Sequence, residues 1–193
     1  PKPSSAASDV YKRQELIQVM KEEPKICHYL DLPIQHANDT ILKRMGRRTS
    51  KQELIDIVQK LRKEIPDICL RTTLITGFPG ETQEQHEEVM EFIDTLEFDR
   101  LGAFTYSPEE DTPAATFEDQ IDEEVKEDRQ ADIMELQQEI SLEKGESRVG
   151  QVLTVMIEGK VSGESAYIGR TYGDAPKVDG YIFVQTGELL MTG

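Results

Sequence analysis

The regular alternation of strand-like and helix-like segments is the feature that most restricts the fold of this 193-residue chain. Strand-like runs at 27–34, 69–77 and 100–107 alternate with helix-like segments at 38–45 and 49–65, at 82–97 and at 121–144. Such an alternation is typical of βα units, in which each helix packs against a shared parallel sheet. The sequence therefore predicts an α/β fold over residues 15–146.

The expected helices have recognisable starts and apolar faces. Ser50 and Glu53 form a capping-box pair, and Thr82 with Gln85 has the same spacing at the next helix. Apolar residues recur at helical spacing after both caps and again in the acidic helix at 121–144. The faces expected to be buried are Leu54, Ile57, Val58, Leu61 and Ile65; then Val89, Phe92, Ile93 and Leu96; then Ile121, Val125, Ile133, Leu136 and Ile140.

The sequence pattern changes after Glu146. From Val149 on, short alternating runs are broken by Gly and Asp, which predicts a small antiparallel β module of OB-like or barrel-like form. We therefore expect a domain at 147–193. At the other end, residues 1–14 have neither helical nor strand periodicity, and we interpret them as a foreign or disordered tail.

Negative charge is concentrated in the middle of the chain. Residues 81–146 hold 23 Asp/Glu and 4 Lys/Arg, whereas residues 1–80 hold 10 and 14. A block of this sign repels phosphate backbones, so direct nucleic-acid binding is not expected. Two interpretations stay open: a solvated acidic face, or a docking face for a basic protein.

The two cysteines, Cys27 and Cys69, lie 42 residues apart without the paired spacing of a zinc site or disulfide framework. Each opens a strand, so we expect both to be small buried residues rather than catalytic groups. This cysteine usage indicates a reducing compartment, and no apolar run has the length of a membrane helix. We therefore expect a cytoplasmic protein without a membrane partner.

Three strand ends supply the candidate ligand site, because ligands of parallel α/β proteins bind at the carboxyl ends of strands. The ends carry Gln35 and His36, then Gly77, Phe78, Gly80 and Glu81, then Tyr106, Ser107, Glu109 and Glu110. Gly77 and Gly80 could let a ligand approach the backbone, beside a helix N-terminus. An adenosyl group or a carboxylate suits such a turn; an ordinary tight βα turn is the alternative.

Other polar residues near these ends receive structural interpretations. We expect His36 to be a polar residue of the rim that is hydrogen-bonded to a neighbouring loop. Asp31, inside the first strand, is expected to be a buried, paired carboxylate. Tyr106 could equally well contact a ligand or cover the core. No catalytic residue and no metal ligand is assigned from the residues alone.

Four stretches, "YLDLPIQHANDTILKRMGRR", "RTTLITGFPGET", "FTYSPEEDTPAA" and "RTYGDAPKVDGYIFV", resemble the ribosomal-protein branch of the radical-SAM methylthiotransferase family. The resemblance covers about residues 15–193. It implies the C-terminal half of a radical-SAM partial (β/α) barrel, followed by a small β-barrel TRAM domain that is OB-like. It also implies S-adenosylmethionine and, in a full-length parent, two [4Fe–4S] clusters.

The resemblance also implies an activity: methylthiolation of the β carbon of an aspartate in a small-subunit ribosomal protein, by a monomeric enzyme. It places the cofactor against Gln35, Gly77, Phe78, Gly80, Glu81 and Tyr106. The substrate is expected to dock on Glu109, Glu110, Asp111, Asp174 and Asp179. The CxxxCxxC cluster motif of the family is absent from these residues, so we interpret the chain as a fragment, truncated at both ends and inactive alone.

Two alternative functions are kept. The first is a transfer-RNA methylthiotransferase of the same family, whose corresponding loop usually reads like "SxRPGTPA" rather than the acidic "SPEEDTPAA" found here. The second is a non-catalytic acidic module that binds a basic protein partner. The acidic loop favours a basic protein substrate over RNA.

Overall fold

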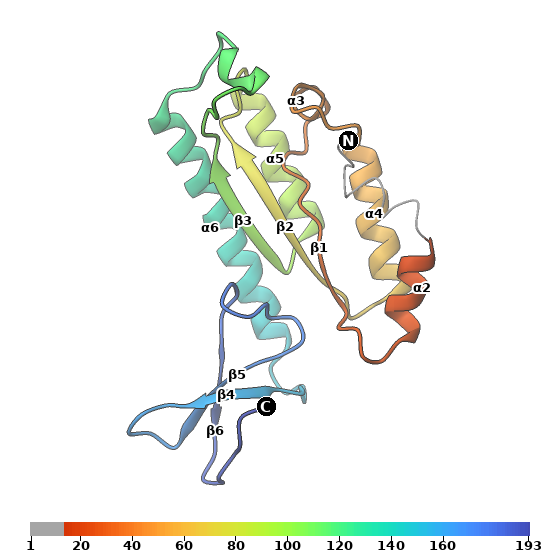
Figure 1. Cartoon of the computed structure of the whole chain (residues 1–193), viewed down its shortest axis with the longest axis vertical. Helices are drawn as coiled ribbons and strands as arrows, with labels where there is room; N and C mark the ends of the chain where they lie inside the picture. The colour runs from red at the N-terminus through yellow and green to blue at the C-terminus, as the bar shows by residue number, and fades with distance from the viewer. Residues whose placement is uncertain (1–13) are drawn as a thin grey trace.

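The computed structural model describes residues 14–193. They form two three-stranded sheets, with helices that pack against the first sheet (Figure 1). The proposed tail at 1–14 lies outside the described residues except for Gln14, which begins the first described helix. In chain order the elements are α2 (Gln14–Glu22), β1 (Tyr29–Asp31), α3 (Asp39–Arg44), α4 (Lys51–Glu64), β2 (Cys69–Thr76), α5 (Gln83–Leu96), β3 (Arg100–Thr105), the 3-10 turn η1 (Pro113–Thr116), α6 (Glu123–Ser147), β4 (Met156–Lys160), β5 (Ala166–Arg170) and β6 (Ile182–Gln185).

The first sheet is parallel, with the strand order β1-β2-β3, as the βα alternation predicts. The first strand is shorter than the predicted 27–34. Pro33 has no N–H to donate, and the chain leaves the ladder there before returning through an isolated bridge between Gln35 and Leu74. Gln35 takes a left-handed backbone conformation at this return, with φ of 74°.

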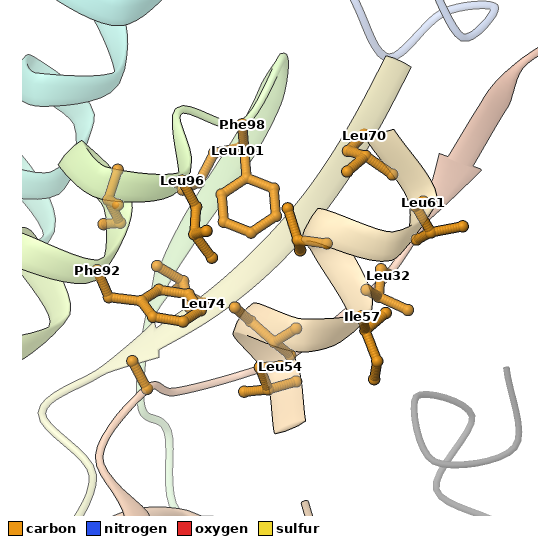
Figure 2. Close-up of a cluster of buried hydrophobic side chains, with 14 of the residues drawn as sticks. Leu32, Leu54, Ile57, Leu61, Leu70, Leu74, Phe92, Leu96, Phe98 and Leu101 are labelled. Carbon is orange, nitrogen blue, oxygen red and sulfur yellow. The ribbon is translucent and has the colours of Figure 1, made fainter. Parts of the chain in front are cut away.

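A single core lies between the parallel sheet and its helices. Along β2, buried Leu70, Thr72, Leu74 and Thr76 alternate with half-buried residues, so one face of the strand packs inward. The predicted apolar faces of α4 and α5 meet this face, and Figure 2 shows Leu54, Ile57, Leu61, Phe92 and Leu96 gathered around Leu70 and Leu74. Both predicted capping boxes are present, which confirms the predicted starts of these helices.

Helix α6 differs from the prediction. Ile133 and Ile140 are buried as expected, but Val125 is 38% exposed. Three polar side chains, Lys126, Arg129 and Gln137, are buried instead. They are buried because each one ends at a hydrogen-bond acceptor of the sheet or its connecting turns.

The second sheet is antiparallel, with the order β4-β5-β6, which confirms the predicted change of architecture after α6. The loop at 171–179 joins it to the lower end of the parallel sheet. Arg100 donates to the Asp174 carboxylate at 2.5 Å, and the Tyr29 hydroxyl donates to Asp179 at 3.3 Å. The Tyr172 hydroxyl donates to the Asp67 carbonyl oxygen at 2.7 Å. We call this set of contacts the joint.

Two sequence predictions about β1 and its surroundings are wrong. Asp31, on the edge strand β1, is exposed rather than buried, although it is paired as predicted: its carboxylate lies 3.4 Å from Arg71 of the central strand β2. Cys69 is buried as expected, but Cys27 is exposed because it precedes the short strand in an open turn. Over residues 14–193, no helix combines the length and the apolar character needed to cross a bilayer.

Candidate functional site

The three parallel strands end side by side, and their carboxyl ends form one rim. The Ile75 N–H donates to the Gln35 carbonyl oxygen at 2.8 Å, and the Tyr106 N–H donates to the Thr76 carbonyl oxygen at 2.8 Å. The Phe78 and Tyr106 rings meet edge to face with centroids 5.1 Å apart. The convergence predicted from the three sequence ends is therefore confirmed.

A cavity of about 370 Å³ opens at this rim. Three of the predicted cofactor residues, Gln35, Phe78 and Tyr106, line it together. Its remaining wall comes from β2, from the end of α3 and from the segment after β3: Arg44, Met45, Gly46, Arg47, Ile75, Thr112, Pro113 and Ala114. A partly apolar cleft with a few convergent polar groups is the usual form of a small-molecule site.

Glu81 is the centre of the turn at 77–81 rather than a residue of the cavity wall. It is 3% exposed, and its carboxylate accepts the N–H groups of Gly77 at 2.7 Å and Phe78 at 3.2 Å. Arg129 of α6 donates to the carboxylate at 3.2 Å and to the Glu81 carbonyl oxygen at 3.1 Å. Glu81, which was predicted to contact the cofactor, thus stabilises the turn through hydrogen bonds within the protein.

The ionisation of Glu81 follows from these contacts. Burial opposes the charged carboxylate, but the neighbouring His36, the Arg129 guanidinium and the Gly77 N–H outweigh it and hold the pKa of Glu81 below its usual value. His36 was expected to be a polar rim residue hydrogen-bonded to a neighbouring loop; it is 2% exposed, with Nε2 3.6 Å from the Glu81 carboxylate and Nδ1 accepting the Asn38 N–H at 3.0 Å. The buried charge of Glu81 is therefore fully supported by protein groups.

The two rim glycines have a structural explanation in this fold. Both have positive φ, 66° at Gly77 and 79° at Gly80. A Cβ at Gly77 would lie 2.2 Å from Lys126 Cγ, and one at Gly80 would lie 2.3 Å from an Asp119 carboxylate oxygen. Side chains of the chain itself thus occupy the space that we had assigned to an approaching ligand. A direct cofactor contact at these two glycines stays a prediction.

Arg47 is the residue of the cavity that the sequence analysis missed. It is half-buried, and burial lowers the pKa of its guanidinium. No ion pair to its side chain is found among residues 14–193. The buried Tyr106 hydroxyl of the same cavity also has no hydrogen-bond partner in that part of the chain. The basic run "KRMGRR" in an acidic protein was the sequence signal that could have revealed Arg47.

A second arginine of this run holds the segment that follows β3 in place. Arg44 makes two hydrogen bonds of 2.8 Å with the Asp119 carboxylate, and its guanidinium lies 4.9 Å from the centre of the Phe117 ring. The Gly80 N–H donates to the Asp119 carbonyl oxygen at 2.8 Å. These contacts fix the C-terminal end of the loop at 107–120 beside the cavity.

The predicted docking residues separate into two groups. Glu109, Glu110 and Asp111 are exposed on the loop that also supplies the cavity wall. Asp174 and Asp179 lie instead in the joint, at the far end of the sheet, where their carboxylates are bound by groups of the same chain. The structure brings only the first group to the rim.

The cysteines do not fit the cluster that the family resemblance implies. No group of three metal-ligating side chains occurs among residues 14–193. Burial raises the pKa of the Cys69 thiol to about 12, which disfavours the thiolate that an iron–sulfur cluster requires. Both cysteines also lie toward the amino ends of the strands, opposite the rim. We therefore derive no step through a cluster in this chain.

Comparison with known proteins agrees with this architecture. Residues 4–93 match the model of the radical SAM superfamily, and residues 149–193 match the TRAM domain. The structure resembles coproporphyrinogen III oxidase (HemN) from Escherichia coli with a TM-score of 0.57 at 16% identity, over 83% of this chain and 42% of that chain. At this identity the similarity shows the fold alone: a partial radical-SAM fold followed by a small sheet domain.

Sequence relatives are more specific. The chain is 63% identical to "Ribosomal protein uS12 methylthiotransferase RimO" of Lachnoclostridium phytofermentans, over 93% of this chain and 41% of the relative. It is 53% identical to the protein of the same name from Desulfitobacterium hafniense, over 91% of this chain and 39% of that relative. The chain thus spans about two fifths of the length of these relatives. Over about nine tenths of its own length, the chain is therefore similar to RimO-type radical SAM methylthiotransferases, and its radical SAM and TRAM matches agree with that similarity.

Proposed function

We propose that the full-length protein is a radical-SAM methylthiotransferase that modifies the β carbon of an aspartate in the small-subunit ribosomal protein uS12. The observation that carries this proposal is the 63% identity to a uS12 methylthiotransferase across nearly the whole chain. The name of that relative specifies a ribosomal protein, which favours this substrate over transfer RNA and over a non-catalytic role. We also propose that the protein is a monomer and is located in the cytoplasm.

The rim cavity fits S-adenosylmethionine. Phe78 and Tyr106 offer aromatic surface for an adenine ring, and Gln35 offers an amide for its polar edge or for the ribose. Arg47 is a half-buried cation without a partner among residues 14–193, and it suits the carboxylate of the methionine part. When bound, S-adenosylmethionine supplies the methyl group and the adenosyl group that radical chemistry uses.

The residues of this chain hold and orient that cofactor at the rim. Glu81 and Arg129 keep the turn at 77–81 closed, and Lys126 donates to the Tyr106 carbonyl oxygen at 3.1 Å from behind the turn. The Phe78 and Tyr106 rings exclude water from one wall of the cavity. In the proposal, iron–sulfur clusters, two in number, are bound by parts of the protein other than this chain.

The acidic loop beside the cavity supports a basic substrate. Glu109, Glu110 and Asp111 are exposed on the loop that supplies part of the cavity wall, and no ion pair among the described residues neutralises them. Opposite charge of this kind steers a basic protein toward a site and repels phosphate. We propose that this loop docks uS12 so that its aspartate faces the cavity.

The test is an anaerobic reaction of the full-length protein with S-adenosylmethionine, a sulfur source, a reductant and purified uS12. We expect mass spectrometry to find one methylthio group in place of a hydrogen on an aspartate of uS12. A RimO relative, prepared and assayed in parallel, is the positive control. The proposal is overturned if the relative modifies uS12 and this protein does not. Replacing Arg47 by Met should weaken S-adenosylmethionine binding in calorimetry without loss of the folded state.

A further inference from the structure

Several interior polar contacts of α6 lie at the rim, behind the cavity that is proposed to hold the cofactor. Helix α6 has 25 residues, which corresponds to about 37 Å of length. Figure 1 shows it running along the whole parallel sheet, from the rim to the small sheet. Its first turns contact the ends of β2 and β3, and its last turn lies near Asp99 at the other end of the sheet. The helix therefore joins the two ends of the molecule.

Arg129 is the strongest link between α6 and the rim. Its side chain is 8% exposed, and one guanidinium nitrogen donates to both the carbonyl oxygen and the carboxylate of Glu81. That carboxylate in turn accepts the N–H groups of Gly77 and Phe78. Since Phe78 lines the cavity, a single chain of contacts connects Arg129 to the cavity wall.

Two further contacts of α6 act at the same place. The Thr76 hydroxyl donates to the Lys126 carbonyl oxygen at 3.2 Å, and the Lys126 ammonium donates to the Tyr106 carbonyl oxygen. The Lys126 side chain also fills the space above Gly77. As a result, the Phe78 and Tyr106 rings are both held through backbone groups that α6 supports.

We propose that Arg129 is a positioning residue for the cofactor rim, acting on S-adenosylmethionine binding through Glu81 without touching the cofactor. The proposal rests on the proposed function only for the identity of the cofactor. Removing Arg129 leaves the Glu81 carboxylate buried with less counter-charge, so the turn at 77–81 opens to hydrate it. An open turn displaces Phe78 from the cavity wall.

Arg129→Met in the full-length protein tests the proposal, with Gln137→Met as the matched control. Gln137 lies on the same helix, is 4% exposed, and donates to the Phe98 carbonyl oxygen at 2.9 Å, away from the rim. Hydrogen exchange of a peptide covering residues 77–82 reports the turn without any cofactor. We expect exchange at this peptide to become faster in Arg129→Met and to stay unchanged in Gln137→Met.

Calorimetry with S-adenosylmethionine then measures the consequence. We expect Arg129→Met to weaken binding about tenfold, the lower end of what loss of an outer supporting partner costs at metal sites, and Gln137→Met to leave it unchanged at a comparable loss of Tm. If Arg129→Met fails to fold, Arg129→Lys carries the comparison, since it keeps the charge but loses the guanidinium fork, and smaller shifts in the same direction are expected.

Unchanged exchange at 77–82 in a folded Arg129 variant overturns the proposal, as does equal weakening of cofactor binding in Arg129→Met and Gln137→Met. A wild-type protein that binds no S-adenosylmethionine overturns the proposed function instead. In that case the exchange measurement still decides whether Arg129 orders the turn, so the two failures are distinguishable.

Discussion

The parallel sheet and the small antiparallel sheet each have three strands, but they are stabilised in different ways. The core around the parallel sheet comprises 23 buried hydrophobic residues between Ile17 and Ile140. In the small sheet and the segment that follows it, Ala166 and Tyr167 are buried, whereas Phe183, Leu189 and Met191 are 70–87% exposed. The comparison teaches that helices supply the apolar cover of the first sheet, and that the second depends on polar contacts at the joint.

The largest expected difference between the two sheets is in the loss of stability when an apolar side chain is removed. Phe92 is 2% exposed in the core, with its ring 6.2 Å from that of Phe98. Phe92→Ala should lower the free energy of unfolding by about 3–5 kcal/mol, because a large cavity replaces the ring. Phe183→Ala, at an exposed ring, should change it by less than about 0.5 kcal/mol. Urea unfolding followed by circular dichroism measures both, and equal losses would contradict the comparison.

The joint should come next in size. The Asp174 carboxylate accepts from Arg100 and from the N–H and hydroxyl of Thr171, at 2.5, 2.8 and 2.6 Å. Asp174→Ala should cost about 1.5–3 kcal/mol in the stability of the small sheet, because charged hydrogen bonds are lost. Limited proteolysis after residue 147 reports the release of the sheet.

A matched control for the joint is Glu158→Ala. Glu158 pairs with Arg170 at 2.6 Å inside the small sheet, with both side chains partly exposed. A surface pair contributes about 0–1 kcal/mol, so proteolysis should change little. Faster cleavage in Glu158→Ala than in Asp174→Ala would show that the joint is not what retains the sheet.

Acid should weaken the same joint. Burial opposes ionisation of Asp174, but the Thr171 hydrogen bonds and the Arg100 charge outweigh it and hold the pKa of Asp174 below its usual value. A depressed pKa in the folded state stabilises the protein above the unfolded value, about 3.9 for Asp, and this contribution is lost as the pH falls through the folded value. We expect proteolytic release of the small sheet to increase below about pH 4.

Asp174→Asn sharpens the pH prediction, since an amide does not titrate in this range. Its release of the small sheet should be higher than that of the wild type at pH 7 and should change less between pH 7 and pH 3. An equally steep acid response in both proteins would assign the effect to other carboxylates.

The smallest expected effect is at Tyr172. Its side chain is 41% exposed, and its hydroxyl donates to the Asp67 carbonyl oxygen at 2.7 Å. Tyr172→Phe removes this one hydrogen bond and should cost about 1 kcal/mol or less. A shift in the proteolysis rate as large as that of Asp174→Ala would mean that the neutral contacts dominate the joint.

The elements that sequence predicted well are those with a local signal. The capping residues at Ser50 and Thr82 and the apolar spacing that follows them depend on neighbours a few residues away. The βα alternation likewise predicts the parallel sheet and the meeting of its three strand ends. In the candidate site, Gln35, Phe78 and Tyr106 were placed together correctly for this reason.

The contacts that sequence did not reveal depend on partners that are distant in sequence. Arg129, 48 residues away, holds the Glu81 carboxylate, and a cofactor contact at Glu81 stays a prediction. Gly77 looks like an open position until Lys126 fills the space above it. The burial of Lys126 and Arg129 on an acidic helix has no signal within the helix itself. Such contacts between residues far apart in sequence determine the role of Gly77 and Glu81 in the turn, and hydrophobic periodicity carries no signal for them.

Because Cys27 is exposed and Cys69 is buried, a fluorescent label on Cys27 can be used to monitor the joint. A maleimide dye at neutral pH needs an accessible thiol, so within this chain it should attach to Cys27 and leave Cys69 unmodified. Cys27 lines a cavity of about 280 Å³ whose wall includes Tyr172 of the loop that reaches across from the small sheet. A dye at that one position would report, in real time, whether the two sheets stay together while a substrate is bound.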